Sequence, residues 1–255
     1  MCNDHCGWKH RLSGGNMKVI SNNLIASETY EMILEIDSFE TVEPGQFMHL
    51  RSGREDHVLR RPISIASFED GKMSLIYKVV GEGTASPSTF KEGQTVDALG
   101  PLGSGFQVLD FKEVLVVGGG MGVAPLYQLG KTLVAKGAKV TFVLGFASDD
   151  AVYYLDKFME LGQVVITTDD GSMGVKGHVG NVVDHLDDFD AIYACGPLPL
   201  LHYLKKKFEN HPHLYISLEQ RMACGIGACY ACDTKDKKHR VCCDGPVFNA
   251  KEVEL

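Results

Sequence analysis

Residues 221–232 read Arg-Met-Ala-Cys-Gly-Ile-Gly-Ala-Cys-Tyr-Ala-Cys, and two further cysteines, Cys242 and Cys243, follow a short polar segment. The thiols of the stretch have the spacing C-x4-C-x2-C, which is typical of plant-type [2Fe–2S] sites. Glycines between the first two thiols let the backbone fold tightly, and backbone N–H groups of such a loop can bond to cluster sulfurs. The stretch therefore predicts a small [2Fe–2S] domain over residues 213–255, with ligands at Cys224, Cys229 and Cys232.

Three other uses of cysteine compete with a cluster. A structural zinc site needs four ligands, commonly in two pairs, and C-x4-C-x2-C matches that arrangement poorly. A disulfide framework is typical of small secreted chains, and we expect no secretory signal in residues 1–16. Residues 229–232 alone match a redox C-x-x-C motif, but such a motif is expected to open a helix after a strand. The spacing leaves Cys242 and Cys243 both as candidates for the fourth ligand, because they are adjacent.

The composition is that of an ordinary globular protein, with 44% hydrophobic and 23% charged residues in a chain of 255. This length exceeds the usual single domain, so we expect two larger domains and a small one. The net charge of −8 disfavours a nucleic-acid partner. No apolar run approaches the roughly 20 residues that span a bilayer. Thiols kept as cluster ligands need a reducing compartment, which predicts a cytoplasmic protein.

The first 16 residues differ from the rest of the chain, because they contain cysteines and histidines but no regular hydrophobic pattern. We expect residues 1–16 to be a disordered leader and assign them no function. Metal binding by Cys2, Cys6, His5 and His10 is the alternative.

Residues 17–111 have the pattern of an antiparallel β-barrel. Hydrophobic and polar residues alternate over residues 30–36 and again over residues 73–79, which is the period of a half-buried strand. Clusters of Gly, Pro and Asp separate these and other short segments, and many short strands with such turns favour a closed barrel.

Two motifs within the barrel suit a flavin with a phosphate tail. Residues 59–65 read Leu-Arg-Arg-Pro-Ile-Ser-Ile, in which Arg61 can face a phosphate and Ser64 the edge of a flavin ring. Residues 81–84 read Gly-Glu-Gly-Thr and offer backbone N–H groups and a hydroxyl to a diphosphate. A surface arginine and an ordinary hairpin loop explain the same residues equally well.

Residues 112–212 have the pattern of a doubly wound parallel sheet. Residues 113–126 combine an apolar run, typical of a buried parallel strand, with a glycine-rich turn that opens a helix, where a nucleotide phosphate can bind. A single turn of this kind is weak evidence, but the β–α alternation continues through residues 139–146, 164–167 and 191–195. We assign the glycines of the turn to the nucleotide: Gly118, Gly119, Gly120 and Gly122.

The residues that follow the later strands favour NAD. Residues 145–150 contain two aspartates and neither Arg nor Lys, so a 2′-phosphate would be repelled there and NAD is preferred to NADP. Asp169 and Asp170 follow another strand, at the carboxyl edge where such sheets bind ligands. Cys195 and Gly196 do the same, although a buried apolar thiol is the alternative interpretation of Cys195.

The barrel motifs, taken together, resemble the FAD-binding barrel of the ferredoxin–NADP reductase superfamily. The resemblance implies an FAD site formed by Arg61, Pro62, Ile63, Ser64, Ile76, Tyr77, Lys78, Gly83 and Thr84. In that superfamily the Cys-Gly-Pro turn lies beside the nicotinamide, which places Cys195 and Gly196 there. Glu219 completes the expected cofactor-binding set.

A narrower resemblance covers nearly everything after Met17. The motifs Arg-Arg-Pro-Ile-Ser-Ile, Gly-Pro-Leu-Gly-x-Gly-Phe, Val-Gly-Gly-Gly-x-Gly-Val-x-Pro-Leu and Thr-Asp-Asp-Gly-Ser-x-Gly-x-Lys-Gly-His-Val occur in order before the cysteine stretch. Together they look like the electron-transfer subunit of type B dihydroorotate dehydrogenase. In that family the fourth cluster cysteine directly follows a valine, which selects Cys242. Residues 233–241 are shorter than in some relatives, so the path of this loop is an open point.

The resemblance implies a relay of electrons in pyrimidine biosynthesis. A partner subunit with FMN oxidises dihydroorotate, and electrons cross the [2Fe–2S] cluster to FAD and then to NAD+, in a heterotetramer of two plus two chains. The sequence contains no motif of its own for dihydroorotate, as expected of such a subunit. Another reductase subunit of the same superfamily, such as a ferredoxin-dependent NAD(P)H reductase or a sulfide dehydrogenase component, is the main alternative. A zinc-stabilised binding module is the alternative from a different class, and it would be colourless.

Overall fold

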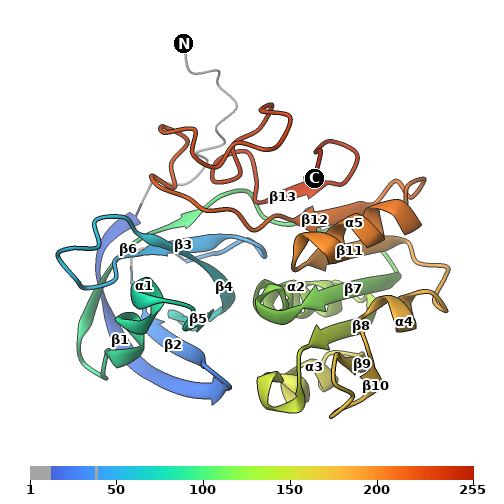
Figure 1. Ribbon diagram of the computed structural model, residues 1–255, viewed down its shortest axis with the longest axis horizontal. Helices are drawn as coiled ribbons and strands as arrows, with labels where there is room; N and C mark the ends of the chain where they lie inside the picture. Colours follow the sequence, from blue (N-terminus) through green and yellow to red (C-terminus); the bar gives the residue numbers. More distant parts are fainter. Residues whose placement is uncertain (1–12, 38–39) are drawn as a thin grey trace.

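The computed structural model describes residues 13–37 and 40–255, which form a barrel beside a layered sheet (Figure 1). The barrel is antiparallel and closed, with the strand order β1-β2-β5-β4-β3-β6, and confirms the predicted fold of this part. The predicted strands at 30–36 and 73–79 are β2 and β5, which pair with Tyr30 opposite Tyr77. The barrel strands are β1 (Ser13–Ala26), β2 (Thr29–Glu35), β3 (Phe47–Leu50), β4 (Arg61–Glu69), β5 (Lys72–Lys78) and β6 (Thr95–Leu102). A short helix, α1 (Glu82–Ala85), and a 3-10 turn, η1 (Pro87–Thr89), connect β5 to β6.

The barrel core is made by the alternating side chains that face inward. Met32 lies opposite Leu75, and Leu34 lies opposite Met73, and all four side chains are fully buried. Burying each of them contributes roughly 1.5–3 kcal/mol. The period-two pattern of the sequence therefore has its cause in this core.

The second part is a seven-stranded sheet with the order β10-β9-β8-β7-β11-β12-β13. Its strands pair in parallel except for β13, which is antiparallel to β12. The strands are β7 (Glu113–Gly119), β8 (Lys139–Phe146), β9 (Gln163–Thr168), β10 (Val175–Lys176), β11 (Ala191–Cys195), β12 (Leu214–Ser217) and β13 (Val247–Asn249). The helices are α2 (Ala124–Ala135), α3 (Leu155–Met159), α4 (Gly180–Val183) and α5 (Leu198–Lys207), and 3-10 turns occur at η2 (Gly120–Val123) and η3 (Asp149–Ala151).

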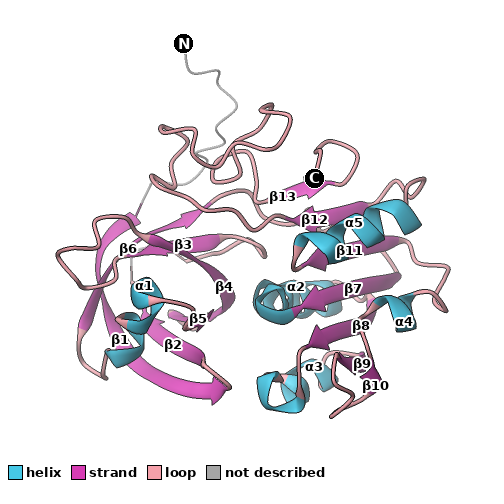
Figure 2. Cartoon of the chain, in the orientation of Figure 1, coloured by secondary structure: helices cyan, strands magenta, loops and turns pink. Residues whose placement is uncertain are grey.

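Helices cover both faces of this sheet, which confirms the doubly wound prediction (Figure 2). Val114 and Val116 of β7 point into the core beneath α2 and α3. Leu115 and Val117 point to the other face, into the core beneath α4 and α5. The apolar run in β7 is continuous because both faces of the strand are buried.

The structural units do not end at the predicted domain boundaries in two places. β1 begins at Ser13, where it pairs with Gly100 of β6, so the barrel starts before residue 17. The sheet does not end at residue 212, because β12 continues it and β13 returns to its edge after the cysteine-rich segment. A boundary drawn at residue 213 therefore divides one sheet. Residues 1–12 of the predicted leader lie outside the described residues.

Side chains from α2 and α3 join the sheet to the barrel. The Gln128 side chain of α2 accepts a hydrogen bond from the Phe68 backbone N–H at 3.1 Å, and Lys131 forms an ion pair with Glu69 at 3.1 Å. Tyr154, at the start of α3, contacts Glu31 and Ser74 of the barrel. Within the described ranges, no helix is both long and apolar enough to cross a membrane.

Candidate functional site

A cavity of about 310 Å³, the barrel cavity, lies between the barrel and the sheet. Nine residues of the predicted cofactor set line it: Pro62, Ile63, Ser64, Ile76, Tyr77, Lys78, Thr84, Cys195 and Glu219. Aromatic and aliphatic walls, a few hydroxyls and one lysine suit a flat ring with a polar edge. The residues present therefore fit a flavin. The other lining residues were not in the predicted cofactor set: Phe47, Val80, Met121, Ser217, Leu218, Gln220, Met222 and Pro246.

Arg61 and Gly83 do not line this cavity but meet beside it. The Arg61 guanidinium donates to the Leu59 carbonyl at 2.7 Å, and a Cβ at Gly83 would lie 2.5 Å from Arg61 Nη2. The Thr84 hydroxyl accepts a hydrogen bond from the Val80 N–H at 3.0 Å, which shapes this turn. A guanidinium held directly against a glycine backbone is an arrangement suited to a phosphate.

A larger cavity of about 640 Å³, the sheet cavity, opens at the carboxyl edge of the strands β7, β8, β9 and β11. Gly119, Gly120, Asp169 and Glu219 of the predicted set line it. Thr167 also lines it, and its hydroxyl is fully buried and without a hydrogen-bond partner in the described part of the chain. A crevice at the carboxyl edge of such a sheet fits a dinucleotide.

The lining of the sheet cavity contains no Lys or Arg among the described residues. Phe146 and Ala147 from the loop after β8 take part, whereas Asp149 and Asp150 do not. The Asp149 carboxylate instead accepts from the N–H of the next residue, Asp150, at 2.8 Å. The predicted preference for NAD over NADP therefore rests on the absence of Lys and Arg from this lining, and not on Asp149 and Asp150.

Several glycines of the predicted site support packing and do not face either cavity. A Cβ at Gly118 would lie 2.8 Å from Val123 Cγ2, and one at Gly122 would lie 2.5 Å from the Gly196 N. These positions allow the turn after β7 to approach β11 closely. Asp170 is also turned away, because its carboxylate accepts from the backbone and hydroxyl of Ser172 at 3.0 and 2.7 Å.

The two cavities share Met121 and Glu219, which therefore mark their junction. Burial raises the pKa of the Glu219 carboxyl. Burial also raises the pKa of the Cys195 thiol, which is 2% exposed and stays protonated at neutral pH. A ring in each cavity would meet at this junction.

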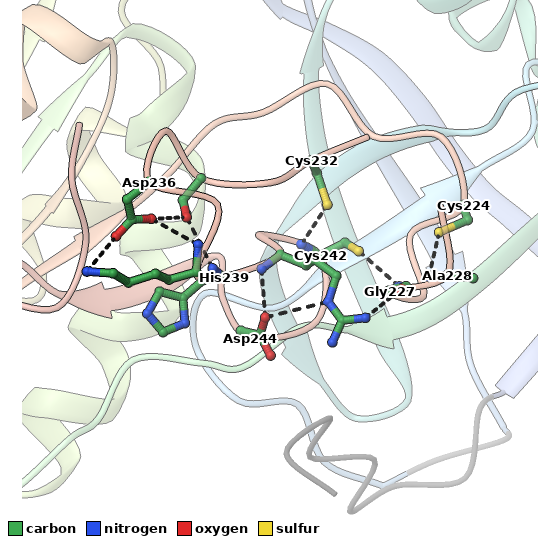
Figure 3. Close-up of polar contacts among 11 residues, drawn as sticks. Cys224, Gly227, Ala228, Cys232, Asp236, His239, Cys242 and Asp244 are labelled. Carbon is green, nitrogen blue, oxygen red and sulfur yellow. Dashed lines mark hydrogen bonds and ion pairs between the residues drawn. The ribbon is translucent and has the colours of Figure 1, made fainter. Parts of the chain in front are cut away.

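The predicted cluster ligands lie in two pairs, of which Figure 3 shows Cys232 with Cys242. The thiol of Cys224 contacts that of Cys229, and the thiol of Cys232 contacts that of Cys242. The hydrogen bond between the two thiols lowers the pKa of Cys232. Because a [2Fe–2S] cluster has two irons, two pairs of thiols match its ligand requirement.

Backbone N–H groups surround these sulfurs. Cys224 Sγ accepts from the N–H groups of Ile226 and Ala228 at 3.4 and 3.3 Å, and Cys242 Sγ accepts from the Gly227 N–H at 3.2 Å. Such bonds stabilise thiolates and fit a cluster. The described residues contain no group of three or more His, Cys, Asp or Glu side chains around one metal position.

His49 of β3 is a neighbour of the cysteine loop that no sequence motif selects. Its side chain is fully buried, and neither ring nitrogen has a hydrogen-bond partner in the described part of the chain. A Cβ at Gly225 would lie 2.9 Å from the His49 Cε1. Burial lowers the pKa of His49 to about 4, so the ring is neutral at neutral pH.

Comparisons with known proteins agree with both cavities and with the cysteine loop. The family described as "Iron-sulfur cluster binding domain of dihydroorotate dehydrogenase B" matches residues 219–254, and "Oxidoreductase NAD-binding domain" matches residues 116–206. A solved structure of an NADH-dependent reduced ferredoxin-NADP oxidoreductase is 31% identical, covers 95% of this chain and 91% of its own, and has a TM-score of 0.85. Phthalate dioxygenase reductase, at 17% identity with a TM-score of 0.66, covers 82% of this chain and 70% of its own and shares the fold.

Two curated relatives carry the same name. The dihydroorotate dehydrogenase B (NAD(+)) electron transfer subunit of Streptococcus pneumoniae (strain ATCC BAA-255 / R6) is 47% identical over 250 residues, covering 94% of this chain and 98% of that protein. The subunit of Listeria monocytogenes serovar 1/2a is 46% identical over 250 residues, with the same coverage of both chains. This chain therefore belongs to the family of electron transfer subunits of dihydroorotate dehydrogenase B.

Proposed function

We propose that this chain carries electrons from a dihydroorotate-oxidising partner subunit to NAD+, through a [2Fe–2S] cluster and FAD. The junction of the barrel and sheet cavities at Met121 and Glu219 is the observation that carries the proposal. At this junction a flavin-sized space adjoins a dinucleotide-sized one, with the cysteine loop on the same chain. The 47% identity to relatives with this named activity supports the dihydroorotate partner.

The proposed division of labour follows from the chemistry of the three groups. When bound, a [2Fe–2S] cluster exchanges one electron at a time, FAD exchanges one or two, and NAD+ accepts two electrons as hydride. The barrel residues Ser64 and Tyr77 would hold and orient the flavin ring, and Arg61 would hold its phosphate. Met121 and Glu219 would contact both bound groups, because they line both cavities. Cys224, Cys229, Cys232 and Cys242 would hold the cluster.

The partner is proposed to contain FMN and to assemble with this chain as a heterotetramer of two plus two, in the cytoplasm, within pyrimidine biosynthesis. The main alternative is a reductase subunit of another complex in the same superfamily. It is less well supported, because the NADH-dependent ferredoxin-NADP oxidoreductase is 31% identical whereas the dihydroorotate dehydrogenase subunit is 47% identical.

Copurification with the dihydroorotate-oxidising partner, followed by an assay of NAD+ reduction by dihydroorotate, tests the proposal. We expect visible absorption from flavin and cluster in the purified chain and dihydroorotate-dependent formation of NADH only when both subunits are present. The partner alone is the control and should reduce a dye but not NAD+. Absence of NADH formation by a complex that contains all three cofactors would contradict the proposal.

A further inference from the structure

Arg240 links the segments that carry the cluster cysteines, although no sequence motif selects it. Its Nη1 donates to the Gly227 carbonyl at 2.7 Å, in the loop between Cys224 and Cys229. Its guanidinium lies 5.2 Å from the centre of the Tyr230 ring, in the turn between Cys229 and Cys232.

The same residue is tied to the turn that follows Cys242. The backbone N–H of Arg240 donates to Asp244 Oδ2 at 2.6 Å, and Arg240 Nε lies 3.8 Å from that oxygen. The backbone carbonyl of Arg240 accepts from the Asp244 N–H at 2.8 Å. Arg240 therefore contacts each of the three turns in which the thiols lie.

These contacts act on a hydrogen bond to a cluster ligand. Gly227 accepts from Arg240 with its carbonyl and donates to Cys242 Sγ at 3.2 Å with its N–H. A bond at one end of this residue limits its movement, and thus keeps the N–H directed at the sulfur. Gly227 has a φ of +74°, a region that other residues rarely adopt.

The charges of Arg240 and Asp244 are only partly screened, because their side chains are 22% and 19% exposed. Reduction adds one electron to the cluster, so its four-thiolate unit becomes more negative by one charge. A fixed cation nearby stabilises the reduced form, and a fixed anion stabilises the oxidised form. Both charges lie within two residues of Cys242 in the sequence.

We propose that Arg240 is a positioning residue for electron transfer, which holds the cysteine turns together and raises the reduction potential of the cluster, while Asp244 lowers it. The inference rests on the proposed ligand set, because it requires the cluster to lie at Cys242. It predicts that loss of either charge shifts the potential, and in opposite directions.

Redox titration of the cluster, followed by electron paramagnetic resonance in the full chain with FAD bound, tests this directly. In Arg240→Gln we expect a lower potential, measured as a smaller ratio of reduced to oxidised cluster at a fixed applied potential. In Asp244→Asn we expect a higher potential. A tenfold change in that ratio corresponds to about 59 mV for a one-electron couple. Lys238→Gln is the matched control, because Lys238 is on the same loop but its side chain is 74% exposed, and its shift should be the smallest.

Shifts of the same sign in Arg240→Gln and Asp244→Asn would overturn the proposal, since loosening of the loop alone predicts that result. Unchanged potentials in both would overturn it as well. If Arg240→Gln does not retain its cluster, Asp244→Asn still tests the charge effect, because it keeps the guanidinium. A reduction potential that does not rise in Asp244→Asn would then contradict the inference. Iron content of Cys242→Ser is measured in parallel, because a full cluster there contradicts the ligand set on which the inference rests, and this outcome is distinct from a failure of the charge effect.

Discussion

At the scale of single residues, Gly83 illustrates how a missing side chain makes room for a charged one. A Cβ at this position would lie 2.5 Å from Arg61 Nη2, so Gly83→Ala should displace the guanidinium from the proposed phosphate position. We expect FAD binding to weaken by about 1.5–3 kcal/mol, the usual strength of a hydrogen bond to a charged group. The measurement is FAD retained per chain and its dissociation constant by flavin fluorescence.

Gly81→Ala is the matched control for this substitution. Gly81 belongs to the same turn and has an extended φ of 174°, and a Cβ added there would have no atom within 4 Å. Its FAD affinity should stay close to that of the parent chain. Equal losses in both variants would mean that the turn tolerates no side chain at all, and that Arg61 is not the reason.

Single residues also mark where inference from sequence reaches its limit. The motif at 118–122 predicted four glycines at the nucleotide, but only Gly119 and Gly120 line the sheet cavity. The prediction failed for the other two because spacing along the chain does not distinguish contact with a ligand from close packing. Sequence spacing likewise could not distinguish Asp169, which lines the sheet cavity, from its neighbour Asp170, which bonds to Ser172. A lone arginine in a polar loop, such as Arg240, gives no signal until tertiary contacts bring distant turns together.

At the scale of elements, α3 is attached to the barrel through its first turn. The Tyr154 hydroxyl contacts the Glu31 carboxylate and lies 3.0 Å from Ser74 Oγ. Burial raises the pKa of Tyr154, so the hydroxyl keeps its proton and donates it to the carboxylate. Tyr154→Phe should lower the free energy of unfolding by about 1–2 kcal/mol, because the half-buried Glu31 carboxylate loses one of its donors and keeps Ser74 and Lys157.

Urea denaturation of the FAD-bound chain measures this effect. Tyr203→Phe is the comparison, because the Tyr203 hydroxyl also bonds to a carboxylate, Asp184, but at an exposed site. Its loss should be smaller, since water replaces the missing partner there. If Tyr203→Phe lowers the free energy of unfolding as much as Tyr154→Phe does, the contact between α3 and the barrel is no more stabilising than an exposed hydrogen bond.

The carboxyl edge of the sheet determines the choice of nucleotide. No Lys or Arg lines the sheet cavity among the described residues, so we expect NADH to reduce the bound flavin much faster than NADPH at equal concentration. Ala147→Arg places a cation in the lining directly after β8, where a 2′-phosphate is commonly recognised, and should raise the relative rate with NADPH. Stopped-flow reduction with both nucleotides measures the ratio. Equal rates in the parent chain would contradict the prediction.

Long elements were predictable from the sequence, and short or returning ones were not. β8 and β11 match the predicted runs at 139–146 and 191–195, because both strands are buried and therefore nearly all apolar. β13 has three residues and pairs with β12 at the edge of the sheet. The cysteine-rich segment separates these two strands in the sequence. Three residues have no measurable periodicity, so the sequence pattern assigned this segment to a separate domain.

At the scale of the whole molecule, the role of the cluster is testable because its four proposed ligands, Cys224, Cys229, Cys232 and Cys242, line neither cavity. The junction of the cavities at Met121 and Glu219 contains none of them. A chain that lacks the cluster should therefore still exchange hydride between NADH and FAD. Transfer between FAD and the partner subunit should stop, because the proposed route from the partner passes through the cluster.

Cys242→Ser and Cys243→Ser separate these two activities. Cys242 Sγ accepts from the Gly227 N–H and contacts Cys232, so Cys242→Ser should lose the cluster, whereas Cys243→Ser should keep it. Iron content and the visible spectrum identify the cluster, and the two activities are NADH-to-dye reduction and dihydroorotate-to-NAD+ transfer with the partner present. We expect Cys242→Ser to retain the first and lose the second. A cluster lost only in Cys243→Ser would mean that the fourth ligand is Cys243, and a cluster-free chain that still couples dihydroorotate to NAD+ would refute the relay.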